Sequence, residues 1–195
     1  MKNKLLILAG ACLAMVLLLL CAACSSAAQG SDRETTKTST NTETGVLQEQ
    51  DSAPVSGPDF DRAKLIETAI ENQKNSYAPY SGYNVSAAVL MDSGEIYTGA
   101  NVENASYPAG VCAEHNAINI AVLNGERRIV AIAIVGGADY TVSDYCAPCG
   151  ICRQVMREFC DPTKMRVIIA ISPTDYKEFT LEELLPESFG PSNLE

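Results

Sequence analysis

Residues 111–135 read VCAEHNAINIAVLNGERRIVAIAIV, a helix pattern followed by a strand pattern. Residues 111–123 predict a helix, which Asn124-Gly125 closes. Residues 129–135 form a continuous run of β-branched and other apolar residues, as expected for a strand that is buried on both faces. A helix that leads into a buried strand is typical of α/β proteins, so this stretch predicts an α/β layered fold.

The flanking sequence continues the alternation of helices and strands. A hairpin is expected at Asp92-Ser93-Gly94, because β-prone residues precede and follow it. The expected elements outside the central stretch are a helix from about 65 to 75, strands over 84–91 and 95–101, a helix over 153–159, a strand over 167–171 and a short helix over 181–185. No internal repeat interrupts this order.

Length and composition limit the classes of function. A chain of 195 residues with 47% hydrophobic residues suits one domain of ordinary size with a buried core. It carries 24 acidic against 14 basic residues, a formal net charge of -10, which argues against binding to the phosphate backbone of a nucleic acid. We therefore expect no nucleic-acid polymer among its partners.

Residues 1–24 have the pattern of an export signal. Lys2 and Lys4 precede an uncharged apolar run that ends in Cys21-Ala22-Ala23-Cys24. This ending resembles a bacterial lipobox, in which Cys24 would be lipidated and become the mature N-terminus. An uncleaved membrane anchor is the alternative, because about 20 apolar residues can span a bilayer. Both interpretations place the rest of the chain outside the cytoplasmic membrane, tethered to its outer side or to the cell envelope.

Residues 25–58 differ in composition from the rest of the chain. They are rich in Ser, Thr, Asp, Glu, Gln and Gly, and they contain few large apolar residues. Such a segment cannot bury enough surface to offset chain entropy, so the sequence predicts a disordered tether. A single globular domain is then expected over residues 59–195.

Two short segments carry a metal-binding pattern. They are Cys112-Ala113-Glu114 and Pro148-Cys149-Gly150-Ile151-Cys152. Each lies where a helix is expected to begin, and the positive end of a helix dipole favours thiolates. Three thiolates would leave the fourth tetrahedral position of a zinc ion open, as in catalytic sites. Glu114 would lie near that position and could transfer protons. Cys-x-Glu followed by Pro-Cys-x-x-Cys is the pattern of zinc deaminases.

Longer motifs surround these two segments. They are YAPYS at residues 77–81, NVENASYP at 101–108, PCGICRQ at 148–154 and LLPESFGP at 184–191. With them, the chain from about Leu65 onward resembles the small, tetrameric, zinc-dependent cytidine deaminases. The resemblance implies a three-layer α/β/α fold with a mixed five-stranded sheet, a homotetramer, and hydrolysis of cytidine and deoxycytidine to uridine and deoxyuridine. Zinc-bound hydroxide would attack C4 of the base, with Glu114 as the proton shuttle.

The resemblance also assigns contacts to the sugar and the base. Asn101 and Glu103 would hydrogen-bond the ribose hydroxyls, and Tyr83 would pack on the pyrimidine where the family usually has Phe. Buried polar groups that match the ribose would reject free cytosine, because they would be left unpaired. Loop-capping roles for Asn101 and Glu103 are the alternative.

Further contacts are implied at the edges of the pocket. The backbone of Ala105 and of Ala113 would meet the edge of the base. Tyr107 and Phe189 would close the pocket from neighbouring subunits. These assignments make the predicted site depend on the assembled oligomer.

His115 is a departure from the pattern, because this family usually has Arg there. Protonated His115 is expected to offset part of the negative charge of the three thiolates. The alternative is a packed helix residue that only fills the space of the Arg. Cys146 and Cys160 lie outside the motifs, and we expect small buried side chains there, not zinc ligands.

Two other functions remain open at this point. A thiol–disulfide oxidoreductase would use Cys149 and Cys152, which could form a disulfide in an oxidising compartment. It would leave Cys112, Glu114 and the run over 101–107 without a role. A deaminase of a related aminonucleoside, or a protein that binds nucleosides or zinc without turnover, is the second alternative.

Overall fold

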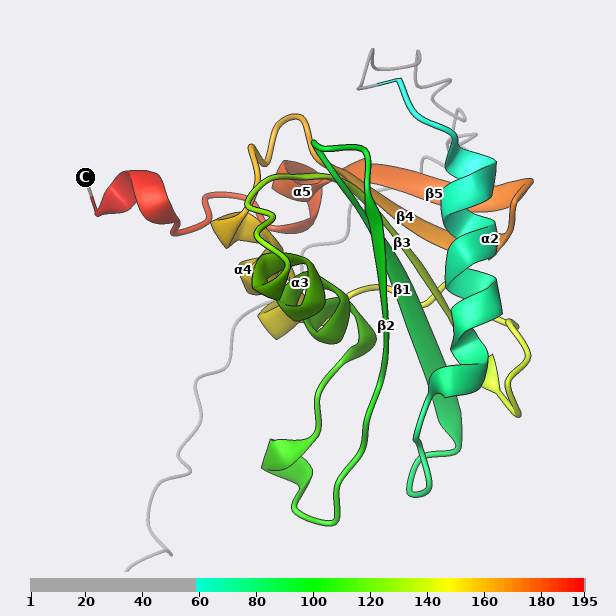
Figure 1. The fold of residues 1–195 in the computed structure, drawn as a ribbon. Coiled ribbons are helices and arrows are strands. Elements are labelled where there is room, and N and C mark those ends of the chain that lie inside the picture. The colour runs from blue at the N-terminus through cyan, green and yellow to red at the C-terminus, as the bar shows by residue number, and fades with distance from the viewer. Residues whose placement is uncertain (1–58, 195) are drawn as a thin grey trace, which may run out of the picture. The chain divides into compact units, whose positions relative to one another are not determined.

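The structure is a computed structural model that describes residues 59–194 (Figure 1). The predicted export signal with Cys24 and the predicted tether over 25–58 lie outside the described residues. Within 59–194, every helix is too short or too polar to cross a membrane. The described residues correspond to the predicted globular domain.

A mixed five-stranded sheet forms the middle of the domain, with strand order β2-β1-β3-β4-β5. β3 and β4 are parallel, and the other neighbouring strands are antiparallel. The predicted hairpin is confirmed, because β1 and β2 pair on either side of Gly94, whose φ is +90°. The strands are β1 (Tyr83–Met91), β2 (Ile96–Ala100), β3 (Ile129–Ala138), β4 (Arg166–Ser172) and β5 (Asp175–Thr180).

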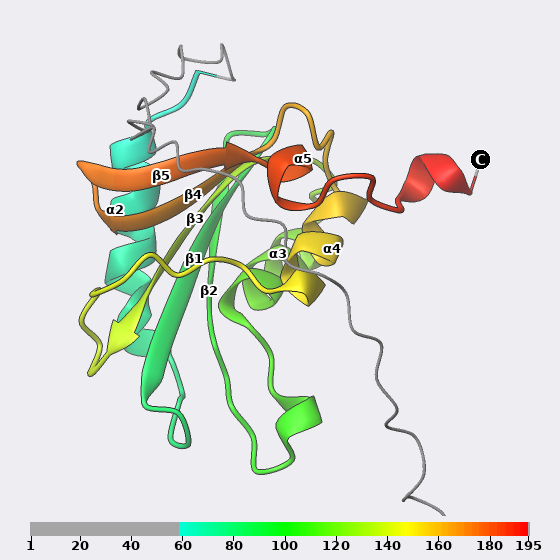
Figure 2. The ribbon, with the colours of Figure 1, turned by 180° about the vertical axis from the view of Figure 1, so that it is seen from behind.

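Helices cover both faces of this sheet, which confirms the predicted three-layer α/β/α fold. α2 (Arg62–Asn72) packs on one face, and α3 (Ala113–Leu123) and α4 (Gly150–Glu158) lie on the other (Figures 1 and 2). Leu65, Ile66 and Ala69 of α2 are buried against the sheet, because spacings of three and four residues align them along one helix face. The opposite core contains Ile118 of α3 and Met156 of α4.

The boundaries of the predicted helices differ from the structure by up to three residues. α4 begins at Gly150, three residues before the predicted start, because Cys149 caps it and accepts a hydrogen bond from the N–H of Cys152. α2 ends at Asn72, and the chain continues as the 3₁₀ turn η1 (Gln73–Asn75). Short helical segments near the site and the C-terminus are η2 (Tyr107–Ala109), α5 (Leu181–Leu184) and η3 (Pro191–Asn193).

The edge strand β5 has no counterpart among the four strands that the residue pattern predicts. Its sequence, DYKEFT, contains no apolar run, and exposed Asp175 and Lys177 alternate with half-buried neighbours. Pairing with β4, over Arg166↔Thr180 to Ser172↔Asp175, holds it in place. Such an edge strand depends on its partner more than on its own composition.

Gly99 brings the start of α3 close to β2. A Cβ on Gly99 would lie 2.3 Å from the backbone nitrogen of Ala117 and 2.4 Å from the carbonyl oxygen of Ala113, closer than real Cβ atoms approach. Only glycine therefore allows this contact. Because β2 ends at Ala100, the contact places the first turn of α3 beside the start of the loop that begins at Asn101.

Candidate active site

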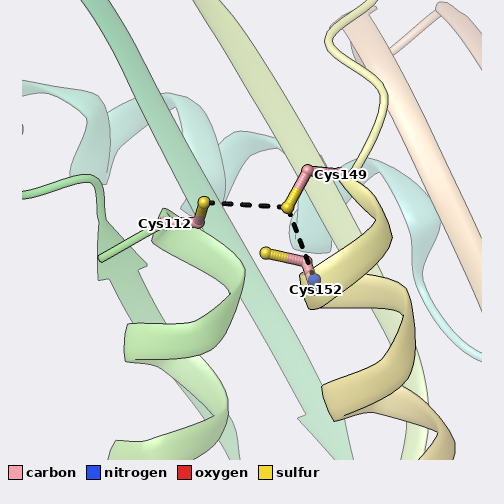
Figure 3. Close-up of side chains that lie close together, drawn as sticks. All are labelled: Cys112, Cys149 and Cys152. Atoms are coloured by element: carbon pink, nitrogen blue, oxygen red, sulfur yellow. Dashed lines mark hydrogen bonds between the residues drawn. The ribbon is translucent and has the colours of Figure 1, made fainter. Parts of the chain in front are cut away.

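Three cysteine sulfurs meet where α3 and α4 begin (Figure 3). Cys112 is the N-cap of α3 and Cys149 is the N-cap of α4, while Cys152 lies one turn into α4. The three Sγ atoms lie within 4.8 Å of one another, and those of Cys112 and Cys149 are 3.9 Å apart. Thiolates bound tetrahedrally to zinc at about 2.3 Å are separated by about 3.8 Å. The cluster therefore fits a zinc ion.

Hydrogen bonds between these thiols shift the pKa values of Cys112 and Cys152 in opposite directions. A hydrogen bond from Cys152 lowers the pKa of Cys112 to about 7. The same bond, together with burial, raises the pKa of Cys152. The N–H of Cys152 also approaches the sulfur of Cys149 at 3.5 Å, at the positive end of α4. Zinc binding must displace the remaining thiol protons, so it is coupled to pH.

Glu114 is a buried carboxylic acid in the first turn of α3. Only 4% of its surface is exposed, and burial raises its pKa above the usual range. The charge of His115, which is half-buried on the same helix, acts in the opposite direction. A buried carboxyl with a raised pKa can hold or release a proton near neutral pH, as a general acid–base residue requires.

Glu103 lies in the loop between β2 and α3. Its Oε2 accepts the backbone N–H groups of Tyr80 at 2.8 Å and Ser81 at 3.2 Å. Hydrogen bonds, first from the Ser81 side chain and then from the Tyr80 backbone, lower its pKa, so it is ionised. Glu103 thus has a loop-organising role as an ionised hydrogen-bond acceptor. A cavity of about 350 Å³ adjoins it, lined by Tyr80, Ser81, Glu103, Asn104, Tyr107 and Gly110.

Asn101 is also engaged in the loop. Its Oδ1 accepts the hydroxyl of Ser76 at 2.6 Å and the N–H of Val85 at 2.8 Å, and its Nδ2 donates to the carbonyl of Tyr83 at 3.0 Å. Asn101 therefore caps the loop through these hydrogen bonds, as the alternative role predicted. One N–H of its amide has no acceptor within residues 59–194.

The remaining predicted contacts occupy different environments. Tyr83 is half-buried on β1 and close to Cys146, since a Cβ on Gly136 would meet both side chains. Ala113 is fully buried at the start of α3, whereas Ala105 is exposed in the loop.

Two predicted aromatic contacts are exposed. Tyr107 is 77% exposed, and Phe189, on the C-terminal segment, is 59% exposed. Within the described residues, the Tyr107 ring meets the ring of Tyr80 edge-on at 6.1 Å. Neither aromatic side chain is covered by other residues of the range 59–194.

Within residues 59–194, Cys146 and Cys160 lie outside the cluster of three cysteine sulfurs that could hold a metal ion. Burial raises the pKa of Cys146 to about 11 and that of Cys160 to about 12, so both are protonated thiols at neutral pH. Both pack against the core on the α3 side of the sheet.

Sequence reasoning missed the residues that support the cysteine loop. Arg153 follows Cys152 and donates to the carbonyl of Pro148 at 2.9 Å and to that of Leu184 at 2.7 Å. It thereby fixes the loop before Cys149 to the C-terminal segment. Gln154 donates to the carbonyl of Phe189 at 3.0 Å. The only sequence signal was their position directly after the Cys-x-x-Cys pair.

Comparisons with known proteins agree with this geometry. Residues 61–169 match the family described as "Cytidine and deoxycytidylate deaminase zinc-binding region". The cytidine deaminase of Halalkalibacterium halodurans is 44% identical over 135 residues, 69% of this chain and 98% of that protein. The cytidine deaminase of Sporosarcina psychrophila is 40% identical over 135 residues, 69% of this chain and 96% of that protein.

Solved structures of cytidine deaminases also resemble this chain. The crystal structure of cytidine deaminase from Burkholderia pseudomallei is 39% identical and has a TM-score of 0.59, covering 65% of this chain and 97% of that one. That from Mycobacterium tuberculosis is 35% identical with a TM-score of 0.58, covering 68% and 99%. The matched region includes all three clustered cysteines and spans more than half of the sequence. The chain therefore belongs to the zinc-binding cytidine deaminase family.

Proposed function

We propose that this protein is a zinc-dependent enzyme that hydrolyses cytidine and deoxycytidine to uridine and deoxyuridine, with release of ammonia. The observation that carries the proposal is the cluster of three cysteine sulfurs with a buried glutamic acid two residues after Cys112. The similarity to cytidine deaminases supports a nucleoside as the substrate. A redox function would leave Cys112 and Glu114 without a role.

The three cysteines and Glu114 would have separate roles, in zinc binding and in proton transfer. Cys112, Cys149 and Cys152 would hold zinc and leave its fourth coordination position free. Bound zinc would supply Lewis acidity, which makes a hydroxide nucleophile available near neutral pH. Glu114 would accept the proton that water loses and deliver it to N3 of the base. It would then take the proton of the new C4 hydroxyl and pass it to the amine, which leaves as ammonia while the C4 carbonyl forms. Burial in the first turn of α3 would keep this carboxyl beside the reacting atoms.

Substrate binding would use the predicted contact residues, of which Glu103 and Tyr107 line the cavity. Asn101 has one amide N–H without an acceptor within residues 59–194, and Glu103 is an ionised carboxylate, so the pair suits sugar hydroxyls. Tyr83 would lie against the pyrimidine, and the backbone of Ala105 and of Ala113 would meet the base edge. The exposed rings of Tyr107 and Phe189 would cover the nucleoside in a neighbouring subunit.

Turnover of cytidine by the purified full-length protein tests the proposed function. The change in ultraviolet absorbance as cytidine becomes uridine should be seen with zinc bound, stop when a chelator removes the zinc, and return when zinc is restored. A zinc-loaded protein that leaves cytidine unchanged would favour another aminated nucleoside. A protein without zinc but with a Cys149–Cys152 disulfide would favour the thiol–disulfide oxidoreductase.

We also propose that the enzyme is a homotetramer. Large apolar side chains are exposed on α3, α4 and the C-terminal segment: Leu123 is 86% exposed, Ile151 70% and Phe189 59%. Exposed apolar groups on a folded domain mark interaction surfaces. Sedimentation equilibrium should give the mass of four chains. Full activity from a species with the mass of one chain would contradict the proposal.

We propose, finally, that the enzyme is exported and tethered outside the cytoplasmic membrane. The support is the sequence pattern of Lys2, Lys4 and the apolar run that ends at Cys24. Cells grown with labelled palmitate should incorporate label into the chain, and Cys24→Ala should abolish it. A membrane-bound chain that never takes up label would favour the uncleaved anchor. A chain recovered only from the cytoplasm would refute export.

A further inference from the structure

A buried polar network lies behind Asn101, and its members have no role in the chemistry described above. Ser76 is 6% exposed and Asn84 is 4% exposed. A polar side chain is costly to bury unless it forms hydrogen bonds, so the partners of these two residues define their role.

In this network Asn84 donates a hydrogen bond to Ser76, and Ser76 donates one to Asn101. Nδ2 of Asn84 donates to Oγ of Ser76 at 3.0 Å, and the Ser76 hydroxyl donates to Oδ1 of Asn101 at 2.6 Å. The backbone N–H of Val85 donates to the same Oδ1. Two donors on one side fix that atom of Asn101 as the oxygen. The amide nitrogen must then face the other way, where it donates to Tyr83 and retains one free N–H.

The far end of the network is attached to a strained turn. Oδ1 of Asn84 accepts the backbone N–H of Tyr140 at 3.2 Å. Asp139 and Tyr140 have φ values of 51° and 56°, in the left-handed region that non-glycine residues rarely adopt. Such strain persists only where surrounding contacts hold it. Through Ser76, Asn84 thus links the turn after β3 to the amide of Asn101.

Asn101 and Glu103 lie on the same side of an extended segment, because Val102 between them forms β-bridges with Tyr77 and Val111. Asn101 offers a donor and ionised Glu103 an acceptor. This pair is complementary to a hydroxyl group, which accepts from one and donates to the other. Cytidine and deoxycytidine share their 3′- and 5′-hydroxyls, so the group recognised is one of these two.

We propose that Ser76 and Asn84 are positioning residues that orient the Asn101 amide and so determine discrimination between nucleosides with and without this sugar hydroxyl. The inference rests on the proposed cytidine deaminase function. If Ser76 loses its hydroxyl, Oδ1 of Asn101 keeps one donor instead of two, and the amide can rotate. The free N–H is then no longer held toward the sugar.

The test compares kcat/KM for deoxycytidine, 2′,3′-dideoxycytidine and 5′-deoxycytidine, using the full-length protein. The wild type should disfavour the analogue that lacks the recognised hydroxyl. Ser76→Ala should lower kcat/KM about tenfold for substrates that carry this hydroxyl and leave it unchanged for the analogue without it. Asn84→Ala should have the same pattern, and it replaces Ser76→Ala if that variant does not fold. In an Asn101→Ala background, Ser76→Ala should have no further effect.

Ser86→Ala is the matched control. Ser86 is fully buried on the same strand as Asn84, and its hydroxyl bonds Asn72 and the carbonyl of Gly99 but not Asn101. Its loss should leave discrimination at the wild-type value. The inference would be overturned, while the proposed function stands, by either of two results. One is an equal fall in kcat/KM for all three nucleosides in Ser76→Ala. The other is wild-type discrimination in both Ser76→Ala and Asn84→Ala. A wild-type protein that deaminates none of them refutes the proposed function, and the inference with it.

Discussion

Glu114→Gln should lower kcat for cytidine by at least about 10³-fold and leave the zinc content unchanged. Gln has nearly the same shape as Glu but cannot accept the proton that water loses. Among residues 59–194, Glu114 is the one buried carboxyl: it is 4% exposed and lies two residues after Cys112. It is not a member of the three-sulfur cluster, so its replacement should spare the metal. Steady-state kinetics and elemental analysis of the same preparation check both parts.

Glu67→Gln is the control for this substitution. Glu67 is exposed on α2, which covers the opposite face of the sheet from α3. The same chemical change there should leave kcat at the wild-type value. Residual turnover in Glu114→Gln within tenfold of the wild type would show that another group moves the protons. Loss of zinc from Glu114→Gln would instead show that this carboxyl supports the metal.

Local signals predicted the central elements well. Residues 111–135 gave α3 and β3, because helical periodicity and a continuous apolar run are properties of neighbouring residues. The cysteine positions at helix starts were also predictable, and Cys112 and Cys149 are indeed the N-caps of α3 and α4. Spacing along the chain could not bring these helices together. That depends on Gly99, which lets α3 rest on β2, and on the order of the strands.

Long-range contacts account for what the sequence did not reveal. β5 is not predictable from its own composition, and pairing with β4 places it at the edge of the sheet. Ser76 and Asn84 appear as ordinary polar residues in the sequence, and only their burial behind Asn101 gives them a role. The sequence left a loop-capping role open for Glu103, and the backbone groups that give it this role lie 22 and 23 residues away. The chemistry of a motif is local, whereas the groups that orient it come from distant parts of the chain.

Cys152→Ser should weaken zinc binding by more than about 100-fold and abolish turnover, whereas Cys160→Ser should retain both. A serine hydroxyl is not ionised near neutral pH, so it is a poor substitute for a zinc-binding thiolate. Cys160 is a suitable control because it lies just after α4, packs against the same core and has a pKa raised to about 12. A raised thiol pKa is common to both residues. What distinguishes Cys152 is that its sulfur lies within 4.8 Å of two others.

Acidification, like removal of a cysteine ligand, should weaken zinc binding. The pKa of Cys112 is about 7 without metal and that of Cys152 is raised, so protons compete more strongly for the thiolates as the pH falls. Zinc retained after dialysis should therefore decrease from pH 8 to pH 5. Cys160→Ser should follow the wild-type curve, because its thiol takes no part in the competition. If Cys152→Ser kept its zinc across this range, the metal would be bound elsewhere. In the wild-type protein, Cys149 and Cys152 would then not be zinc ligands and could form a disulfide.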